Sequence, residues 1–283
     1  MIEHNRDTPA VDAPAASRPV RLLWTGGWDS TFRLLQLLLA HGLPVAPVYL
    51  VDETRASTQT EFDTMERIRE ALFEAHPGTR ALLQPTRVSR VADIAPDAAI
   101  DCGYARLAAR YGMGNQYAWL ARHCREHALH GIELSCECAL HGAGVMLQAN
   151  IVPMVAPQGY ATFHIPPTAP DADAALVFGA FGLPLVRTTR EQMVAQAQSA
   201  GWMRLMGMTW FCHRPTRAGT PCGVCNPCLT SIKQGFGWRV SRPRRAAGVL
   251  YRMTLLPLRK AVRHIVLKRR ERRASRRPPP TMS

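Results

Sequence analysis

Short apolar strands alternate with amphipathic helices along much of this 283-residue chain. The expected strands cover residues 20–24, 45–51, 80–88 and 131–135. The expected helices cover residues 31–41, 59–76, 117–130 and 191–200. Because successive parallel strands are joined by crossover helices, the alternation predicts an α/β fold, with a parallel sheet and helices on both of its faces. Residues 89–116 and 142–188 show no clear pattern, and we assign no elements there.

The composition indicates a globular protein without a membrane-spanning segment. Apolar residues make up 47% of the chain and charged residues 20%. No apolar run reaches the roughly 18 residues that a membrane span requires. Residues 1–18 are acidic and rich in Ala and Pro, so we expect a disordered leader rather than a secretory signal, and a cytoplasmic protein. In that compartment the eight cysteines favour metal ligands or buried thiols over disulfides.

The net charge of +14 is concentrated at the C-terminal end of the chain. Residues 239–283 contain fifteen Arg and Lys and one acid, Glu271, whereas the other 238 residues carry twenty basic and twenty acidic side chains. Within this basic tail, residues 248–277 predict an amphipathic helix. Its apolar face favours an anionic membrane surface as the partner over nucleic acid. A solubilising or partner-docking tail is the alternative.

A glycine-rich turn, Thr-Gly-Gly-Trp-Asp-Ser at residues 25–30, follows the first expected strand. Gly26 and Gly27 let backbone N–H groups approach an anion closely. Ser30 and Thr31 stand at the start of the next helix, where the helix dipole favours negative charge. The turn therefore predicts a phosphate-binding loop, the alternative being an ordinary strand-to-helix turn. It lacks the lysine of a Walker A loop and the spacing of a dinucleotide fingerprint.

Four cysteines near the C-terminal end have the spacing C-x9-C-x2-C-x2-C, which predicts a metal site. Four thiolates suit tetrahedral Zn2+ and would close the coordination shell, so the expected role of zinc is structural. An Fe–S cluster is the main alternative, but a ferredoxin-type run would place its next cysteine where Ile232 stands. The ligands of this four-cysteine cluster are Cys212, Cys222, Cys225 and Cys228.

Taken together, the turn and the cluster resemble the PP-loop (N-type) ATP pyrophosphatases, and within them the 7-cyano-7-deazaguanine synthases of queuosine biosynthesis. That family carries Ser-Gly-Gly-x-Asp-Ser after its first strand, and ends with Thr-x-x-Glu, Leu-Thr-Trp-x-Cys and Pro-Cys-Gly-x-Cys-x-x-Cys. The corresponding segments here are residues 25–30, 188–191, 208–212 and 221–228, and a Gly-Met-Gly-Asn stretch at 112–115 precedes a helix much as Gly-Arg-Asn does in the family.

The resemblance implies an adenine nucleotide alpha hydrolase-like fold and a carbon–nitrogen ligase. ATP would adenylate a carboxylate, and ammonia or another amine would then displace AMP; the family's acid is 7-carboxy-7-deazaguanine. Asp29 and Ser30 would act in catalysis, with Mg2+ assisting. The residues that would hold the ATP phosphates are Thr25, Gly26, Gly27, Asp29, Ser30 and Thr31.

The implied organisation has four parts, but three segments depart from the family pattern. The parts are a leader (1–18), an ATP-binding α/β domain (19–205), a zinc-binding module (206–238) and a basic tail (239–283). The departures fall where base and substrate would bind, so they bear on the acid rather than on the reaction class. They lie at residues 51–55, at Gly114, where the family has Arg, and at residues 136–141.

Two alternative functions follow from the same features. One is a PP-loop tRNA-modifying enzyme, for which an Fe–S cluster at the four cysteines is the discriminating property. The other is a non-catalytic nucleotide-binding protein that docks on a membrane through its tail, for which ATP binding without AMP formation is the discriminating result. A further hypothesis is that the protein forms a homodimer.

Three further groups invite a functional interpretation and have a simpler one. His123, Glu126 and His127 match the H-x-x-E-H pattern of a metalloprotease, but a solvated helix face is the expectation. Cys136, Cys138 and His141 suit buried thiols at a strand end, with a second metal or a reactive thiol as the alternative. Trp24 and Trp28 flank the glycine-rich turn, and core packing is favoured over base stacking for both.

Overall fold

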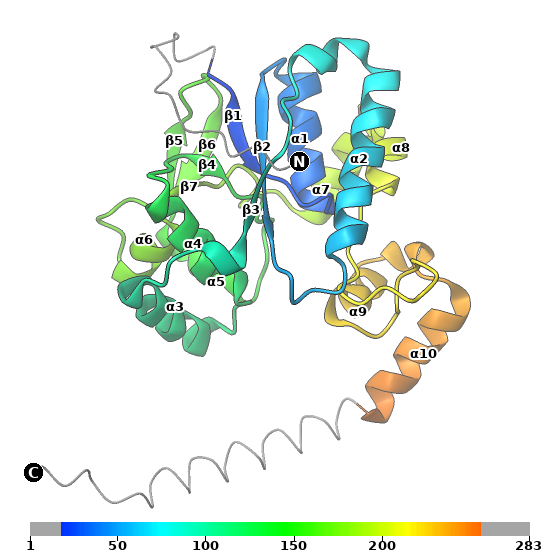
Figure 1. The fold of residues 1–283 in the computed structure, drawn as a ribbon. Helices are drawn as coiled ribbons and strands as arrows, with labels where there is room; N and C mark the ends of the chain where they lie inside the picture. The colour runs from blue at the N-terminus through cyan, green and yellow to red at the C-terminus, as the bar shows by residue number, and fades with distance from the viewer. Residues whose placement is uncertain (1–17, 256–283) are drawn as a thin grey trace, which may run out of the picture. The chain divides into compact units, whose positions relative to one another are not determined.

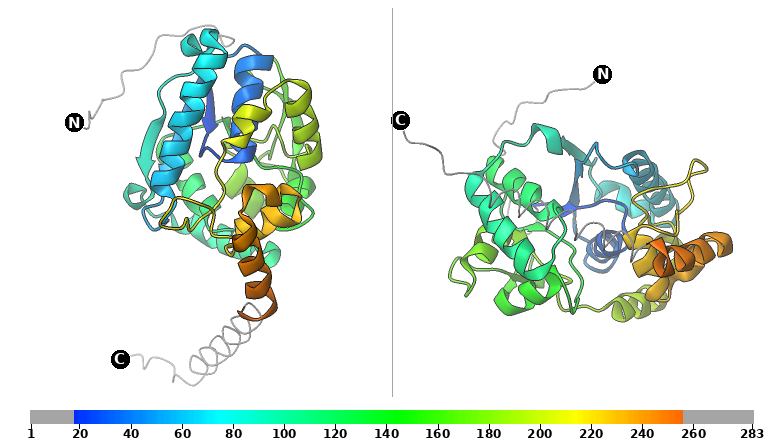
Figure 2. Two further views of the ribbon diagram at one scale, coloured as in Figure 1. Left: turned by 90° about the vertical axis from the view of Figure 1, so that its right-hand side faces the viewer. Right: turned by 90° about the horizontal axis from the view of Figure 1, so that it is seen from below.

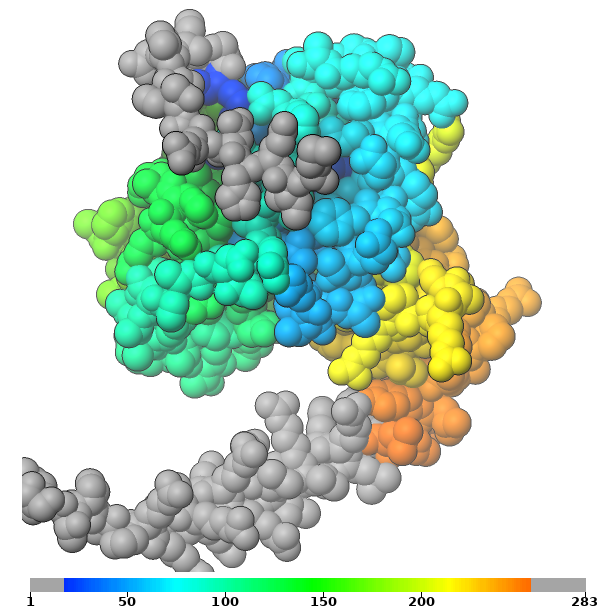
Figure 3. Space-filling view, viewed as in Figure 1, coloured from blue at the N-terminus to red at the C-terminus, as the bar shows by residue number. Residues whose placement is uncertain are grey.

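The computed structural model describes residues 18–255, which are coloured in Figure 3. The expected leader therefore lies almost wholly outside the described residues, as does the tail beyond residue 255. The described residues divide into two compact units, the first ending at Trp210 and the second starting at Phe211. No described helix combines the length and apolarity needed to cross a bilayer.

The first unit is built on a five-stranded parallel sheet with the order β3-β2-β1-β4-β7 (Figure 1). The strands are β1 (Val20–Leu23), β2 (Val45–Val51), β3 (Arg87–Arg90), β4 (Ile132–Glu133) and β7 (Phe181–Gly182). The register of β1 and β2 places Val20 beside Val45. Strand β2 is buried at six of its seven positions, as a strand covered on both faces must be.

Helices cover both faces of this sheet. One layer contains α1 (Trp28–Leu35), α2 (Thr58–Ala75), α7 (Arg190–Ser199) and α8 (Met203–Gly207), and the left view of Figure 2 looks onto it. The other layer contains α3 (Ala98–Tyr111), α4 (Gln116–Glu126), α5 (Ala143–Asn150) and α6 (Ala172–Phe178). The α/β fold with a helix-covered parallel sheet is thus confirmed.

The core fills the space between the sheet and these layers. Leu23, Ile132 and Phe178 belong to the cluster that packs against the α3–α6 layer. Trp24 and Phe32 are fully buried, and Trp28 is 5% exposed, so these three aromatic side chains in and beside the glycine-rich turn pack in the interior. This agrees with core packing as the expected role of both tryptophans.

A buried ion pair fastens α1 to β4. Arg33 donates from Nε and Nη2 to the two carboxylate oxygens of Glu133 at 2.7 and 2.8 Å. Tyr160 Oη donates to the same carboxylate at 2.6 Å, and both charged side chains are under 5% exposed. A bidentate pair of this kind fixes orientation as well as distance. It therefore holds the last turn of α1 in place beside the end of β4.

Several element boundaries differ from those expected. Helix α1 starts three residues before the expected residue 31 and continues as a wide π-helical turn over Gln36–Ala40. The strand expected over 80–88 is wrong: Pro77–Ala81 form a 3-10 turn and β3 starts only at Arg87. Strand β3 is an edge strand with three of its four residues exposed, so it carries no apolar run to mark it.

The two segments without a readable pattern contain short elements. Residues 89–116 contain α3. The carboxylate of Asp97 caps the N-terminus of this helix by accepting a hydrogen bond from the N–H of Ile100. Residues 142–188 contain α5, α6, β7 and an antiparallel hairpin of β5 (Val152–Val155) and β6 (Ala161–His164). None of the elements in the second segment exceeds eight residues, which leaves too few turns or alternations for a period to appear.

The second unit contains α9 (Asn226–Lys233), a 3-10 turn (Phe236–Arg239) and α10 (Arg242–Met253). It starts at Phe211, five residues after the expected domain boundary. Helix α10 packs on the cysteine loop so closely that a Cβ placed on Gly248 would lie within 2.3 Å of the carbonyl oxygen of Gly223. The first part of the basic tail is therefore joined to the cysteine module, and its helix begins at Arg242 rather than at residue 248.

Candidate functional site

The strand order has its switch point at the carboxyl ends of β1 and β4. The chain leaves β1 for β2 on one side, whereas β4 is followed in the sheet by β7 on the other side. Neighbouring strands whose connections run in opposite directions leave an opening between their following loops, which is where open parallel sheets bind ligands. Three segments follow these strand ends: residues 24–27 after β1, 134–138 after β4 and 183–189 after β7.

The glycine-rich turn needs its first glycine for two reasons. Gly26 has a φ of +67°, a backbone conformation that L side chains rarely adopt. A Cβ at this position would also lie 3.1 Å from Thr64 Cγ2 and 3.2 Å from Met65 Cγ on α2. The Gly26 carbonyl accepts from the N–H of Trp210 at 2.9 Å. The turn is thus held against α2, with its backbone bare on the ligand side.

The start of α1 offers donors and hydroxyls to an anion. Gly27 is the N-cap residue, and no side chain caps the helix. The hydroxyls of Thr25 and Ser30 make hydrogen bonds of 3.4 Å within the turn, from Gly27 N–H to Thr25 Oγ1 and from Ser30 Oγ to the Gly27 carbonyl. Bonds of this length are weak and are readily exchanged for a ligand. The arrangement suits a phosphate at a helix N-terminus.

Thr31 does not belong to this set, contrary to the expectation from sequence. Its side chain is fully buried and its hydroxyl accepts from Trp24 Nε1 at 3.1 Å. Its N–H is bonded to the Gly27 carbonyl within the helix. The helix starts at Trp28 and not at residue 31, so Thr31 lies a full turn inside α1, on the face that packs into the core. We therefore omit Thr31 from the phosphate-binding residues.

Asp29, Glu137 and Arg190 meet at this edge of the sheet. Arg190 Nη2 lies 3.1 Å from Asp29 Oδ1 and 2.7 Å from Glu137 Oε1. Desolvation is the main cause that raises the pKa of Asp29; Arg190 opposes the rise and Glu137 adds to it, and the resulting pKa is about 7. Asp29 therefore changes its charge near neutral pH in the unliganded protein.

Two further polar atoms after β4 are buried without hydrogen-bond partners among the described residues. They are Glu137 Oε2 and Ser135 Oγ. Buried polar atoms are normally satisfied, and an unsatisfied one at a switch point marks a place for a ligand, water or ion. Carboxylate oxygens are the ligands that Mg2+ prefers. Asp29 and Glu137 thus present carboxylate oxygens at this edge of the sheet.

Tyr117 and the cysteines after β4 line the same edge. Tyr117 Oη of α4 lies 4.0 Å from Cys136 Sγ, and burial raises the pKa of the Cys136 thiol to about 12. Cys138 Sγ lies 3.9 Å from Gln148 Nε2. The backbone N–H of Cys138 donates to the Thr188 carbonyl at 3.0 Å. The two thiols have different partners, because β4 ends at Glu133 and both residues lie in the following loop. Cys136 is therefore a neutral group and not a thiolate.

The four-cysteine cluster is assembled as expected. The Sγ atoms of Cys212, Cys222, Cys225 and Cys228 all lie within 4.8 Å of one another. Cys212 and Cys225 Sγ lie 3.8 Å apart, and Cys222 and Cys228 Sγ 3.9 Å apart. Tetrahedral zinc with bonds of about 2.3 Å requires sulfur separations of about 3.8 Å. The cluster can therefore hold a metal ion such as zinc.

The protein backbone supports this cluster. The N–H of Cys222 points to Cys212 Sγ at 3.2 Å, and the N–H of Cys225 points to Cys222 Sγ at 3.3 Å. Such contacts stabilise thiolates. Gly223 has a φ of +78° and a Cβ there would come within 2.3 Å of the Arg244 carbonyl oxygen. Only glycine fits between the cysteines at this position.

The other candidate metal groups do not assemble. His123 is buried, and burial, with a smaller contribution from His127, lowers its pKa to about 4. The expectation of a solvated face holds for Glu126 and His127 but is wrong for His123. In the part of the chain that the structure describes, the four cysteines form the one group of three or more ligands close enough to share a metal. Cys136, Cys138 and His141 form no such group.

Sequence reasoning did not assign a role to Glu137, Arg190 or Tyr117. Glu137 was part of a segment noted only as a departure from the family pattern. Arg190 follows a two-residue strand that leaves no trace in the sequence. Tyr117 is one of several aromatic residues on α4 and carries no motif. No protein-family model matches the chain, and no curated protein matches it in sequence.

Proposed function

We propose that this protein is an ATP-dependent ligase of the PP-loop type, which activates a carboxylate by adenylation for attack by ammonia or another amine. The observation that carries the proposal is the meeting of Asp29, Glu137 and Arg190 beside a glycine-rich turn, at the switch point of a parallel sheet. Such a site offers backbone donors and a cation for phosphate, and carboxylates for a metal ion.

The ATP phosphates would bind at the start of α1. The backbone of Gly26 and Gly27 permits close approach, and the hydroxyls of Thr25 and Ser30 replace their weak internal bonds with bonds to phosphate oxygens. Asp29 and Glu137 would hold Mg2+, which neutralises charge on the phosphates and on the departing pyrophosphate. Binding of the ion requires the ionised form of Asp29, whose pKa of about 7 it would lower.

The reaction is one of positioning and charge stabilisation. A carboxylate oxygen of the substrate attacks the α-phosphorus of ATP, and the bond to pyrophosphate breaks. The amine then attacks the acyl carbon of the adenylate, loses a proton and displaces AMP. With ammonia the product is an amide. The nitrile forms when the amide oxygen attacks the α-phosphorus of a second ATP, pyrophosphate leaves, and AMP and the remaining N–H protons are then lost. Ser30 donates to a phosphate oxygen, and Arg190 offsets the charge that gathers on the phosphates and the two carboxylates.

For the acid we propose 7-carboxy-7-deazaguanine, on the resemblance of the terminal motifs. The loop after β4 replaces the segment of the family that would contact this substrate, and here it supplies Cys136 and Cys138. Tyr117 of α4 lies beside Cys136. The four cysteines would hold a structural zinc ion. An Fe–S cluster, as in a tRNA-modifying alternative, places a cage of iron and sulfide between its ligands, and sulfur atoms within 4.8 Å leave little room for it.

The decisive assay combines the purified protein with ATP, Mg2+, 7-carboxy-7-deazaguanine and ammonium, with products identified by mass spectrometry. Asp29→Asn keeps the size of the side chain and removes its charge, and Asp63→Asn, on the exposed face of α2, is the matched control. We expect AMP and 7-cyano-7-deazaguanine from the parent and the control but not from Asp29→Asn.

Two other outcomes are informative. Formation of AMP without the nitrile product would support the ligase proposal but would mean that the acid substrate is a different one. ATP binding with no AMP formed, for this acid and for a panel of other carboxylic acids, overturns the ligase and favours a non-catalytic nucleotide-binding protein.

A further inference from the structure

The described part of the second unit is positively charged throughout. Residues 211–255 contain seven Arg, one Lys and no Asp or Glu. No cation in this stretch can therefore form an ion pair with a side chain of the same stretch. Like charges that are not compensated locally add up to a field that attracts an extended anionic surface.

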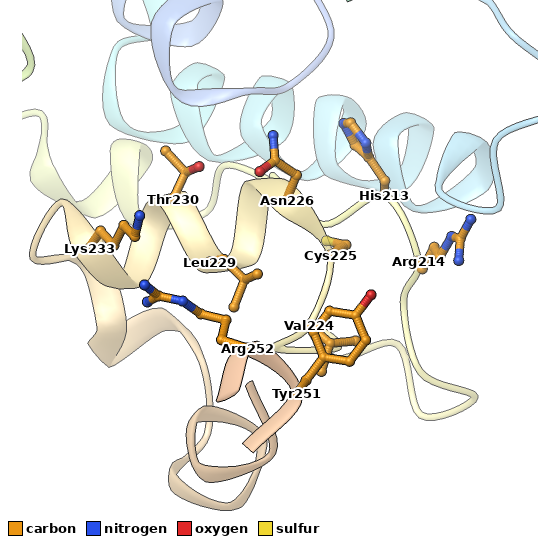
Figure 4. A pocket seen from close by; sticks show the side chains of 10 residues that line it. All are labelled: His213, Arg214, Val224, Cys225, Asn226, Leu229, Thr230, Lys233, Tyr251 and Arg252. Carbon is orange, nitrogen blue, oxygen red and sulfur yellow. The ribbon is translucent and has the colours of Figure 1, made fainter. Parts of the chain in front are cut away.

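A depression in this unit gathers three of these cations around an apolar floor (Figure 4). Arg214, Lys233 and Arg252 lie at its sides, and Val224 and Leu229 line it between them. The hollow measures about 680 Å³ and is open to solvent. Arginine and lysine side chains bind phosphate groups through charge and hydrogen bonds. An apolar floor beside them suits a ligand that carries phosphate groups and also has a less polar part.

An apolar ridge lies beside this depression on α10. Val249, Leu250 and Met253 are 52%, 63% and 74% exposed, and Leu255 just beyond the helix is 53% exposed. Val249 and Met253 share a second, smaller hollow with Arg252, the residue that also lines the first. Arg252 therefore stands at the boundary between a cationic surface and an aliphatic one.

We propose that the second unit docks on an anionic lipid bilayer. Lipid phosphates would bind in the depression at Arg214, Lys233 and Arg252, and the ridge of Val249, Leu250, Met253 and Leu255 would enter the boundary between headgroups and acyl chains. The aliphatic ridge favours lipid over nucleic acid, because a phosphate backbone gains nothing from aliphatic side chains. This docking is independent of the proposed ligase activity, since all of these residues belong to the second unit.

The test is sedimentation of the full chain with vesicles. One set contains phosphatidylcholine alone, and the other contains equal parts of phosphatidylcholine and phosphatidylglycerol. We expect binding to the mixed vesicles, weakened by salt, and little binding to phosphatidylcholine. Equal binding to both sets would contradict the role of the cations.

Point variants distinguish the contribution of the depression and the ridge to vesicle binding from the contribution of the basic residues after residue 255. Leu250→Glu is expected to weaken binding about tenfold or more, because it removes an inserted aliphatic group and adds a like charge to the lipid. Val155→Glu, at a 68% exposed position of the first unit, is the matched control. Lys233→Gln should weaken binding about fivefold, and Arg217→Gln, which removes the same charge away from the depression, should do so less.

Every result decides the proposal. Normal vesicle binding by both Leu250→Glu and Lys233→Gln would show that residues beyond 255 carry the interaction, and would overturn this surface. Binding to an unrelated RNA with none to the mixed vesicles would also overturn it. Circular dichroism and metal content of each variant must equal those of the parent, and AMP formation measured without vesicles reports separately on the ligase.

Discussion

Arg190 Nη2 contacts Asp29 at 3.1 Å and Glu137 at 2.7 Å, so that a single guanidinium joins the start of α1 to the loop after β4. These contacts join Arg190 to residues 161 and 53 positions earlier in the sequence. They also hold two carboxylates close to each other in the absence of a metal ion. In the function proposed above, Mg2+ and the ATP phosphates would replace part of this ion pair.

Arg190→Gln should reduce AMP formation about a hundredfold or more, because it removes charge that stabilises the phosphates and leaves two carboxylates facing each other. The measurement is the steady-state rate of AMP formation with each substrate saturating. Arg187→Gln, three residues earlier and exposed, is the matched control. A rate close to that of the parent would remove Arg190 from the site.

The pKa of Asp29 makes stability depend on pH. Because its folded pKa of about 7 lies above the ordinary value of 3.8, the folded protein binds more protons than the unfolded chain between these values. The resulting stabilisation is present at low pH and is lost as the pH rises toward and through 7. Free energies of unfolding in urea, measured across this range without nucleotide or Mg2+, should therefore fall with pH more steeply in the parent than in Asp29→Asn. Parallel pH profiles of the two proteins would contradict the raised pKa.

Gly26→Ala should destabilise the protein and weaken ATP binding. The new Cβ is strained by a φ of +67° and also meets Thr64 and Met65. Gly42→Ala separates the two causes, since Gly42 has a φ of +62° with nothing within 4 Å of its added Cβ. We expect a loss of about 1 kcal/mol for Gly42→Ala from strain alone. The loss for Gly26→Ala should be larger, as measured by chemical denaturation, and only this variant should lower ATP affinity.

Removal of metal should unfold the second unit rather than act on chemistry alone. The four sulfurs converge on one point, and without an ion their thiolates repel one another. A chelator, or Cys228→Ser, should release the metal and lower the melting temperature, as measured by metal analysis and calorimetry. Cys102→Ser, which alters an exposed cysteine of α3, should change neither property. Unchanged melting of the metal-free protein would refute a structural role.

The features that could be predicted from sequence are those set by local spacing. The glycine-rich turn and the cysteine cluster each lie within a short stretch of chain, and α2 is long enough for its period to emerge. Arg190 and Glu137 could not be placed, since their meeting depends on β4 and β7, which are two residues each. Thr31 was misassigned because the helix starts at Trp28, three residues earlier than the apolar period suggests. A shift of three residues moves Thr31 from the helix N-terminus, where N–H groups are free, into the next turn, where its N–H is bonded to the Gly27 carbonyl.

The contact between Gly223 and Gly248 fixes the position at which the basic residues after Leu255 are attached to the second unit. It anchors α10 at the cysteine loop, so the chain leaves the described residues only seven positions later, at Leu255. Ten Arg and Lys follow within residues 256–283. Once the depression and ridge engage a bilayer, these ten charges meet it as tethered groups at high effective concentration. In the docking proposed above, the contact between Gly223 and Gly248 involves no lipid. It nevertheless links the depression and ridge to the basic residues 256–283, so that both bind the bilayer as one multivalent ligand.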